Sequence, residues 1–195
     1  MILLLALVAG VLAGFGWARW YRRPYQPPDL RYFWLAFVAF LPQFIVVNLP
    51  FTRERFPDRF IAASLLISQF LFLGFGWLNR RLPGMPILIC GVILNFAAIA
   101  ANGGFMPISP QTASRLVSQE VLLDIPPGSR FGKKDIFLLP ENTRFEWLAD
   151  RFLTPTWSPY QVAFSLGDVL IATGVFWLLA YQGRPEYSTN RGVLL

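Results

Sequence analysis

The amino-acid sequence predicts an all-α integral membrane protein with five transmembrane helices and one large loop on the outer face. Three observations lead to this prediction. The chain of 195 residues is 55% hydrophobic and only 14% charged, whereas a soluble domain is typically about 25% charged. All Lys and Arg residues, and every acidic residue except Asp168, lie outside five long apolar runs. Each run has the roughly 17 or more residues that a helix needs to cross a bilayer.

The five runs form one predicted membrane domain over residues 1–195. The expected helices are 1–18, 32–49, 60–78, 85–101 and 159–181. The first run could be mistaken for a signal peptide, but no basic segment precedes it, and Arg19, Arg22 and Arg23 follow it as a stop-transfer pattern. We therefore expect it to be retained. The last helix is expected to begin at Pro159, with Ser158 as its N-cap.

The distribution of basic residues predicts that the N-terminus is outside and the C-terminus inside. Short cytoplasmic loops of membrane proteins carry an excess of Lys and Arg. With this orientation, eight arginines are cytoplasmic: Arg19, Arg22, Arg23, Arg31, Arg80, Arg81, Arg184 and Arg191. The opposing short loop has Arg53, Arg55 and Arg59, which Glu54 and Asp58 partly offset.

The predicted outer loop, residues 103–158, is too long to be a simple connection. A Ser-Pro start signal predicts a helix from residue 110 to about residue 123. Residues 135–139 are expected to be extended. Residues 146–153 place their apolar side chains at helical spacing, so this segment could lie along the membrane surface. We expect a compact, partly helical cap over the transmembrane helices.

Polar side chains within the predicted helices are the main candidates for a functional site, because they are costly in a bilayer. Gln43, Gln69, Asn95 and Asp168 are expected at one depth, about 10–14 Å below the outer boundary. They could form an interhelical hydrogen-bond clamp, or a polar pocket for an ion, a proton or a small ligand. Because no Lys or Arg lies at that depth, the Asp168 carboxyl must be protonated, hydrogen-bonded or hydrated. We expect it to meet Asn95 or Asn102.

The composition also argues against several classes of function. The chain has no histidine and one cysteine, Cys90, which lies in an apolar run and is expected to be buried. The usual protein ligands of metals and redox centres are therefore scarce, and we predict no cofactor and no metal, although a bound lipid or pigment stays open. The basic residues flank apolar runs instead of forming one stripe, which argues against nucleic-acid binding.

Several motifs together resemble a known family. They are the run from Leu78 to Gly84, the residue Asn95, the run from Ala101 to Ser109, the pairs Thr143-Arg144 and Trp147-Leu148 followed by Asp150, and the set Ser165, Gly167 and Asp168. Their order and spacing resemble those of a bacterial multi-pass membrane-protein family catalogued only as a domain of unknown function (DUF5317). Members commonly have glycine where this chain has Ala149.

This resemblance supports the membrane topology and a location in the bacterial cytoplasmic (inner) membrane, and it implies no known activity. It implies that Asn102-Gly103-Gly104 and Asp168 belong to one structural unit. The two glycines could provide a left-handed turn, or their amides could form a nest for an anion or ligand. The outer-loop motif contributes Met106, Pro107, Arg144 and Asp150 as further candidates.

Our leading functional hypothesis is a non-enzymatic membrane subunit that packs against other membrane proteins in a larger assembly. Its basis is the shortage of catalytic residue types and the many aromatic and glycine faces. The alternative is a binder of a small molecule, proton or ion, or a transport accessory, that uses the polar layer. An outer-surface enzyme, with Asp150, Glu146 or Asp124 as acid or base beside Arg144, is disfavoured because no spacing defines a reaction. We predict no catalytic residue.

Overall fold

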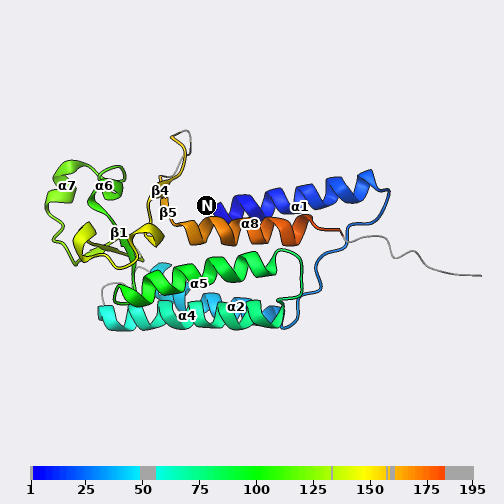
Figure 1. Ribbon diagram of the computed structural model, residues 1–195, viewed down its shortest axis with the longest axis horizontal. Coiled ribbons are helices and arrows are strands. Elements are labelled where there is room, and N and C mark those ends of the chain that lie inside the picture. Colours follow the sequence, from blue (N-terminus) through cyan, green and yellow to red (C-terminus); the bar gives the residue numbers. More distant parts are fainter. Residues whose placement is uncertain (1, 49–55, 133, 157, 159–160, 183–195) are drawn as a thin grey trace, which may run out of the picture.

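Five long α-helices lie side by side in the computed structural model, and a group of short elements forms a cap at one end (Figure 1). The structure describes residues 2–48, 56–132, 134–156, 158 and 161–182, without the side chains of residues 46–48. The long helices are α1 (Ile2–Trp20), α2 (Phe33–Asn48), α4 (Asp58–Leu78), α5 (Met85–Ala101) and α8 (Leu166–Ala180).

Four of the five helices agree with the apolar runs of the sequence. The helix α5 has the predicted bounds, and α1, α2 and α4 differ from theirs by no more than two residues at either end. By length and composition, α1 and α4 could each cross a membrane, whereas α2, α5 and α8 are shorter apolar helices. Four arginines used to predict the orientation, Arg53, Arg55, Arg184 and Arg191, lie outside the described residues.

The predicted start of the last helix is wrong. Pro159 lies outside the described residues, but residues 163–164 form a strand, and α8 begins only at Leu166. Ser165 is the N-cap: its hydroxyl accepts a hydrogen bond from the Asp168 amide, and the Asp168 carboxylate accepts one from the Ser165 amide. This reciprocal capping box is a stronger start signal than a Ser-Pro pair. Asp168 therefore lies in the first turn of α8, not two and a half turns inside it.

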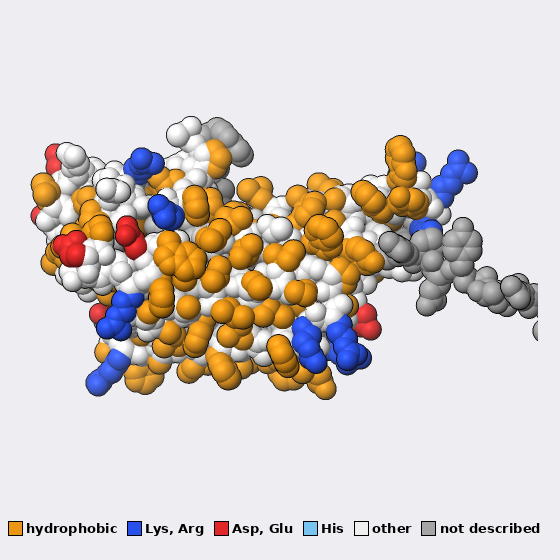
Figure 2. Space-filling model, in the orientation of Figure 1, with side chains coloured by type: hydrophobic (Ala, Val, Ile, Leu, Met, Phe, Trp, Pro, Cys, Tyr) orange, Lys and Arg blue, Asp and Glu red, His pale blue; other side chains and the backbone are white. Residues whose placement is uncertain are grey.

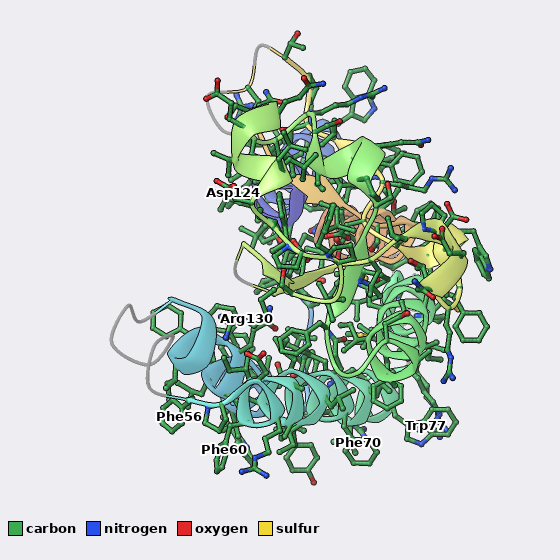
Figure 3. The ribbon with its side chains drawn as sticks, turned by 90° about the vertical axis from the view of Figure 1, so that its left-hand side faces the viewer. Phe56, Phe60, Phe70, Trp77, Asp124 and Arg130 are labelled. Atoms are coloured by element: carbon green, nitrogen blue, oxygen red, sulfur yellow. The ribbon has the colours of Figure 1, made fainter. Side chains whose placement is uncertain are left out.

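The helices form an open row in the order α1, α8, α5, α4, α2. Each packs extensively on its neighbours in this row, and α1 and α2 stand at the two ends without extensive contact with each other. Viewed from the cap end, Phe60, Phe70 and Trp77 of α4 project away from the other helices (Figure 3). The row therefore leaves broad apolar faces uncovered by the described residues.

Glycines on both sides allow α5 and α8 to approach closely. These helices are antiparallel, and Gly84 meets Gly174 while Gly91 meets Gly167. A Cβ atom added at Gly91 would lie 2.5 Å from the Gly167 carbonyl oxygen, and one added at Gly174 would lie 2.6 Å from the Leu88 amide nitrogen. Because both glycine pairs recur after seven residues, they stay on the facing sides of two helices over two turns.

The helix α1 packs on α8 through a second glycine face. A Cβ atom at Gly10 would lie 2.9 Å from the Phe176 carbonyl oxygen, and one at Gly14 would lie 2.5 Å from the Leu179 carbonyl oxygen. This spacing of four residues between small side chains is typical of close helix pairs in membranes. Backbone contact thus replaces large side chains at both interfaces of α8.

The cap combines a small sheet with short helices. In the sheet, β1 (Met106–Ile108) pairs parallel with β3 (Asp135–Phe137), and β2 (Arg130–Phe131) pairs antiparallel with β3. A second pair joins β4 (Phe152–Leu153) to β5 (Ala163–Phe164). The helical pieces are α6 (Pro110–Ala113), α7 (Gln119–Leu123), and the 3₁₀ turns η1 (Pro140–Asn142) and η2 (Glu146–Leu148).

The cap departs from its prediction in two places. The helix expected over 110–123 is broken into α6 and α7, with residues 114–118 between them. The helical surface segment expected over 146–153 is wrong, because only η2 is helical and β4 follows it. The segment is not helical because it pairs with β1: the Asp150 amide donates a hydrogen bond to the Pro107 carbonyl, with an N–O distance of 3.0 Å. Leu148 and Asp150 are therefore buried inside the cap.

Candidate functional site: the junction of the cap and the helices

Asn95 and Asp168 meet where α5 faces the first turn of α8. The Asn95 amide nitrogen donates to one Asp168 carboxylate oxygen at 2.8 Å, and the Ser165 hydroxyl donates to the Asn95 carbonyl oxygen at 2.7 Å. Asn95 and Ser165 are buried. The expected contact between Asp168 and an asparagine of the preceding long helix is therefore present, and each Asp168 oxygen accepts a hydrogen bond from the protein.

Asn102 binds the cap instead of Asp168. Its side-chain amide brackets the backbone of Arg144, donating to the Arg144 carbonyl at 2.8 Å and accepting from the Arg144 amide at 2.9 Å. The same amide nitrogen donates to the Ala98 carbonyl of the last turn of α5. Asn102 thus pairs with one residue of the cap as a neighbouring β-strand would. The Arg144 side chain itself is exposed.

Gly103 and Gly104 form the left-handed exit from α5. Their φ angles are +75° and +91°, a region that favours glycine. The Gly104 amide donates to the Ile99 carbonyl at 2.8 Å, which closes the helix end. Because this amide is already used, and because Gly104 packs against Ala62, the geometry favours turn formation over an anion nest.

Asn79 makes the equivalent clamp at the other end of the bundle. It follows α4 and brackets the Arg31 backbone, with hydrogen bonds of 2.8 Å from the Arg31 amide and 3.0 Å to the Arg31 carbonyl. It also donates to the Phe75 carbonyl of its own helix. The sequence analysis included Asn79 only in the motif run 78–84 and gave it no role, although an asparagine directly after a helix is a recognisable capping signal.

The two predicted glutamines lie elsewhere. Gln43 accepts a hydrogen bond from Ser68 of α4 at 3.4 Å, and Ser68 also donates to the Ala39 carbonyl one turn before Pro42. The Gln69 carbonyl oxygen is buried without a hydrogen-bond partner. Among the described residues, no hydrogen bond joins either glutamine to Asp168. The expected single polar layer is therefore divided, because Gln43 belongs to the contact of α2 with α4 and the Gln69 carbonyl oxygen is unpaired.

A buried ion cluster lies next to the Asn95–Asp168 pair. The Lys134 ammonium is 2.6 Å from an Asp150 carboxylate oxygen and 3.1 Å from an Asp135 carboxylate oxygen. The Asp150 side chain is fully buried. The other Asp150 oxygen has no hydrogen-bond partner, and the contact of Lys134 with Asp135 lacks hydrogen-bond geometry. One ammonium thus serves two carboxylates, with Asp168 close enough to act on both electrostatically.

The cluster changes the acidity of its members. Burial raises the pKa of Asp150 to about 7; the Lys134 ammonium opposes this rise, and the carboxylates of Asp135 and Asp168 add to it. Burial alone would lower the pKa of Lys134, but attraction by the three carboxylates outweighs it and holds this pKa well above its usual value. The Lys134 side chain keeps 34% exposure, so water reaches the cluster from its side.

A cavity of about 140 Å³ lies on the cap beside Asp150. Its polar lining includes the hydroxyl residues Ser109 and Thr112 and the arginines Arg115 and Arg151. A cavity of this size holds several water molecules or a very small solute. Met106 and Pro107 lie behind it in β1 and are buried, so this part of the outer-loop motif builds the cap core.

The described residues include no group of three or more His, Cys, Asp or Glu side chains with the arrangement of a metal site. Cys90 is exposed on α5, which corrects the expectation that it is buried. It faces away from both helices that pack on α5, because the contact side of that helix carries Leu88, Gly91 and Val92.

The sequence analysis missed Lys134 and Asp135, and it named Ser165 only as a residue of the family motif, not as the N-cap of α8. The Ser-x-x-Asp spacing of Ser165 and Asp168 is a readable capping signal. No local signal predicts the pairing of Lys134 with Asp150, because it depends on β1 lying between β3 and the Asp150 segment.

The fold and this junction define a mostly helical protein with a small mixed cap. Among the described residues, two helices, α1 and α4, are long and apolar enough to span a membrane. The chain belongs to a family of unknown function, DUF5317, whose model matches residues 28–180. It is similar to an uncharacterized protein of Thermotoga maritima, with 31% identity over 147 residues, which cover 73% of this chain and 75% of that protein. No solved structure matches. The resemblance noted from the motifs is thereby confirmed.

Proposed function

We propose that this protein is a non-enzymatic, multi-pass subunit of the bacterial cytoplasmic membrane that packs laterally against another membrane protein. The five long helices would lie in the bilayer, with the N-terminus and the cap on the outer side and the C-terminus inside. In support, hydrophobic side chains cover the face over the helices, and charged side chains gather toward the two ends (Figure 2).

Exposed tryptophans support the placement of the inner boundary. Trp17 of α1, Trp34 of α2 and Trp77 of α4 lie toward the helix ends farthest from the cap, with exposed fractions of 58%, 60% and 63%. Tryptophan is enriched at membrane–water interfaces, where its ring meets lipid and its N–H meets water. Arg19 and Arg80 follow two of these tryptophans closely, as expected for a cytoplasmic boundary.

One observation carries the proposal of a protein partner: α1 has two faces of small residues, and the described part of the chain packs on only one of them. Gly10 and Gly14 pack on α8. On another face, Ala9 and Gly16 are exposed, Ala13 is half-buried, and a Cβ atom added at Gly16 would meet nothing within 4 Å. Small faces permit close helix pairing, whereas lipid contact does not require them. A helix of a second membrane protein fits this face.

Single-cysteine labelling should place the two ends on opposite sides of the membrane. In a Cys90→Ser background, Gly128→Cys should react with a membrane-impermeant reagent added to intact cells, because it lies in the cap. Arg80→Cys should react only after the cells are opened. Labelling of Arg80→Cys from outside would contradict the orientation.

The unused small face predicts a selective loss of the partner. Isolated in mild detergent, the protein should carry a second membrane protein at a fixed ratio, measured by native mass spectrometry. Ala9→Phe should reduce this partner several-fold, because a large ring prevents close helix approach. Leu4→Phe, at a position with 64% exposure on a side of α1 away from Ala9, is the matched control and should retain it. A lone wild-type monomer, or equal loss in both variants, would contradict the proposal.

The ion cluster favours a second candidate function, the binding of a proton on the outer face. Its specific observation is the fully buried Asp150, whose pKa is raised to about 7 by burial among other carboxylates. Asp150 belongs to the segment whose backbone pairs with β1. Because its carboxyl would titrate near neutrality, the stability of the cap would depend on external pH. The adjacent cavity would give water, or a small polar ligand, access to this group.

A further inference from the structure

The end of α1 farthest from the cap carries a hollow of about 790 Å³ with three arginines in its lining. We call it the arginine hollow. Arg19, Arg22 and Arg23 contribute the charge, and Phe15, Gly16 and Tyr25 contribute most of the remaining lining. No carboxylate of the described residues lines it. The side chains of the three arginines form no ion pair with any described residue, so the positive charge of the hollow is not neutralised by the described part of the chain.

The backbone of Arg22 is strained at this hollow. The Arg22 amide donates to the Arg19 carbonyl and the Arg23 amide donates to the Ala18 carbonyl, at 3.0 and 2.9 Å. These two bonds define a Schellman ending, in which the residue at the position of Arg22 is left-handed and is usually glycine. Arg22 has a φ of +53°, which costs free energy for a residue with a side chain. Local structure alone would therefore favour glycine there.

The Arg22 side chain does not compensate for this strain within the described residues, where it makes no hydrogen bond or ion pair. Cations near a helix C-terminus also stabilise the helix dipole, but Arg19 and Arg23 already serve that purpose without strain. Strained residues that local packing does not explain are frequently functional. The strain thus favours a partner of the Arg22 guanidinium beyond the described residues.

The surroundings of the hollow fit a lipid. Phe15 stacks on Tyr25 with ring centroids 4.4 Å apart, and Trp17 and Trp20 flank the arginines with exposed fractions of 58% and 84%. A guanidinium matches the oxygens of a phosphate in a bidentate fork. Anionic lipids are enriched on the cytoplasmic face of membranes, where basic pockets bind their head groups. This argument rests on the membrane placement proposed above.

We propose that the arginine hollow binds the phosphate of an anionic phospholipid. Arg19, Arg22 and Arg23 donate hydrogen bonds to the phosphate oxygens, and the acyl chains run along the apolar surface of α1 beside Phe15.

Arg22→Gly separates this role from a structural one. The full chain in non-ionic detergent is titrated with phosphatidylglycerol, phosphatidylcholine or inorganic phosphate, and binding is followed by native mass spectrometry. The wild type should prefer phosphatidylglycerol over phosphatidylcholine by about ten-fold, and Arg22→Gly should lose about ten-fold in affinity for it, as expected for a charge-assisted contact. The unfolding temperature of Arg22→Gly should rise, because the strain is removed.

Arg81→Gln is the matched control, because it removes one positive charge after α4, at the same end of the bundle, outside the hollow. Its affinity for phosphatidylglycerol should stay within about two-fold of the wild type. Equal losses in both variants, or equal binding of the two lipids, would overturn the proposal. Displacement of phosphatidylglycerol by millimolar inorganic phosphate would overturn the proposal that the ligand is a lipid, and would show that the hollow binds free phosphate. Release of the chain from membranes by alkaline carbonate would refute the membrane placement itself, which is a separate outcome.

Discussion

Gly91→Ala is expected to force α5 away from α8 and to destabilise the protein by about 2 kcal/mol or more, the cost of overpacking a rigid interface. The added Cβ atom would lie 2.5 Å from the Gly167 carbonyl oxygen and 2.8 Å from the Ile171 amide nitrogen. Both neighbours are backbone atoms within α8 and cannot rotate aside. Separation of the helices would also weaken the hydrogen bond of Asn95 with Asp168, one turn along the same interface.

Gly74→Ala is the control, because it is expected to change the stability in the opposite direction. Gly74 lies within α4, and a Cβ atom there would meet nothing within 4 Å. Alanine is favoured over glycine inside a helix by about 1 kcal/mol, so this variant should be as stable as the wild type or more so. Thermal unfolding in detergent, followed by tryptophan fluorescence, measures both changes. Similar shifts in the two variants would show that the close contact of α5 with α8 is not what stabilises the fold.

Asp150→Asn is expected to remove a pH dependence from the cap. The pKa of Asp150 is about 7 in the folded protein and 3.8 in an unfolded chain. Between these values the folded state holds a proton that the unfolded state has released, so stability falls as pH rises from about 4 to about 7. The expected change for this group is roughly 2–4 kcal/mol. Lys134 stays charged in both states over this range, because its pKa is raised above 10.5.

Protection of cap amides from hydrogen exchange at pH 5 and pH 7.5 measures this effect, after correction for the intrinsic exchange rate. The wild-type cap should be better protected at pH 5, and Asp150→Asn should show little difference between the two conditions. Asp124→Asn, at an exposed position of the cap, should keep the wild-type dependence. If Asp150→Asn retains the full dependence, Asp150 is not the titrating group and the proton-binding role fails.

The helices were predictable from the sequence where an apolar run has clear helix start and stop signals at its two ends. The helix α5 illustrates this, since Gly84 precedes it and Asn102-Gly103-Gly104 follows it. The helix α8 shows the opposite case. A requirement that every helix span the bilayer alone led to a start at Pro159, although the capping box at Ser165 was visible in the sequence. The length expected of a membrane-spanning helix was given more weight than the capping box, which was the better local signal for the start of α8.

The candidate site was only half predictable for a related reason. Asn95 and Asp168 were paired by an argument from depth that placed Asp168 too far inside its helix. They nevertheless meet, because the glycine pairs fix the register of α5 against α8. The pairing of Lys134 with Asp150 depends on strands that are distant in sequence, and no periodicity reports such contacts. Gln43 was predicted at the same depth, but its hydrogen bond is with Ser68 in the contact of α2 with α4.

The shortness of α8 has a consequence for the bilayer around the protein. With 15 residues α8 is about 22 Å long, whereas α4 with 21 residues is about 31 Å long. Figure 1 shows α8 beginning well short of the level at which α4 begins, with β4 and β5 beyond it. Non-helical backbone at hydrocarbon depth is tolerated only when protein surrounds it. In the proposed orientation, part of the cap therefore lies within the outer leaflet. The hydrophobic thickness that the protein favours also differs around it, with a thinner bilayer beside α8 than beside α4.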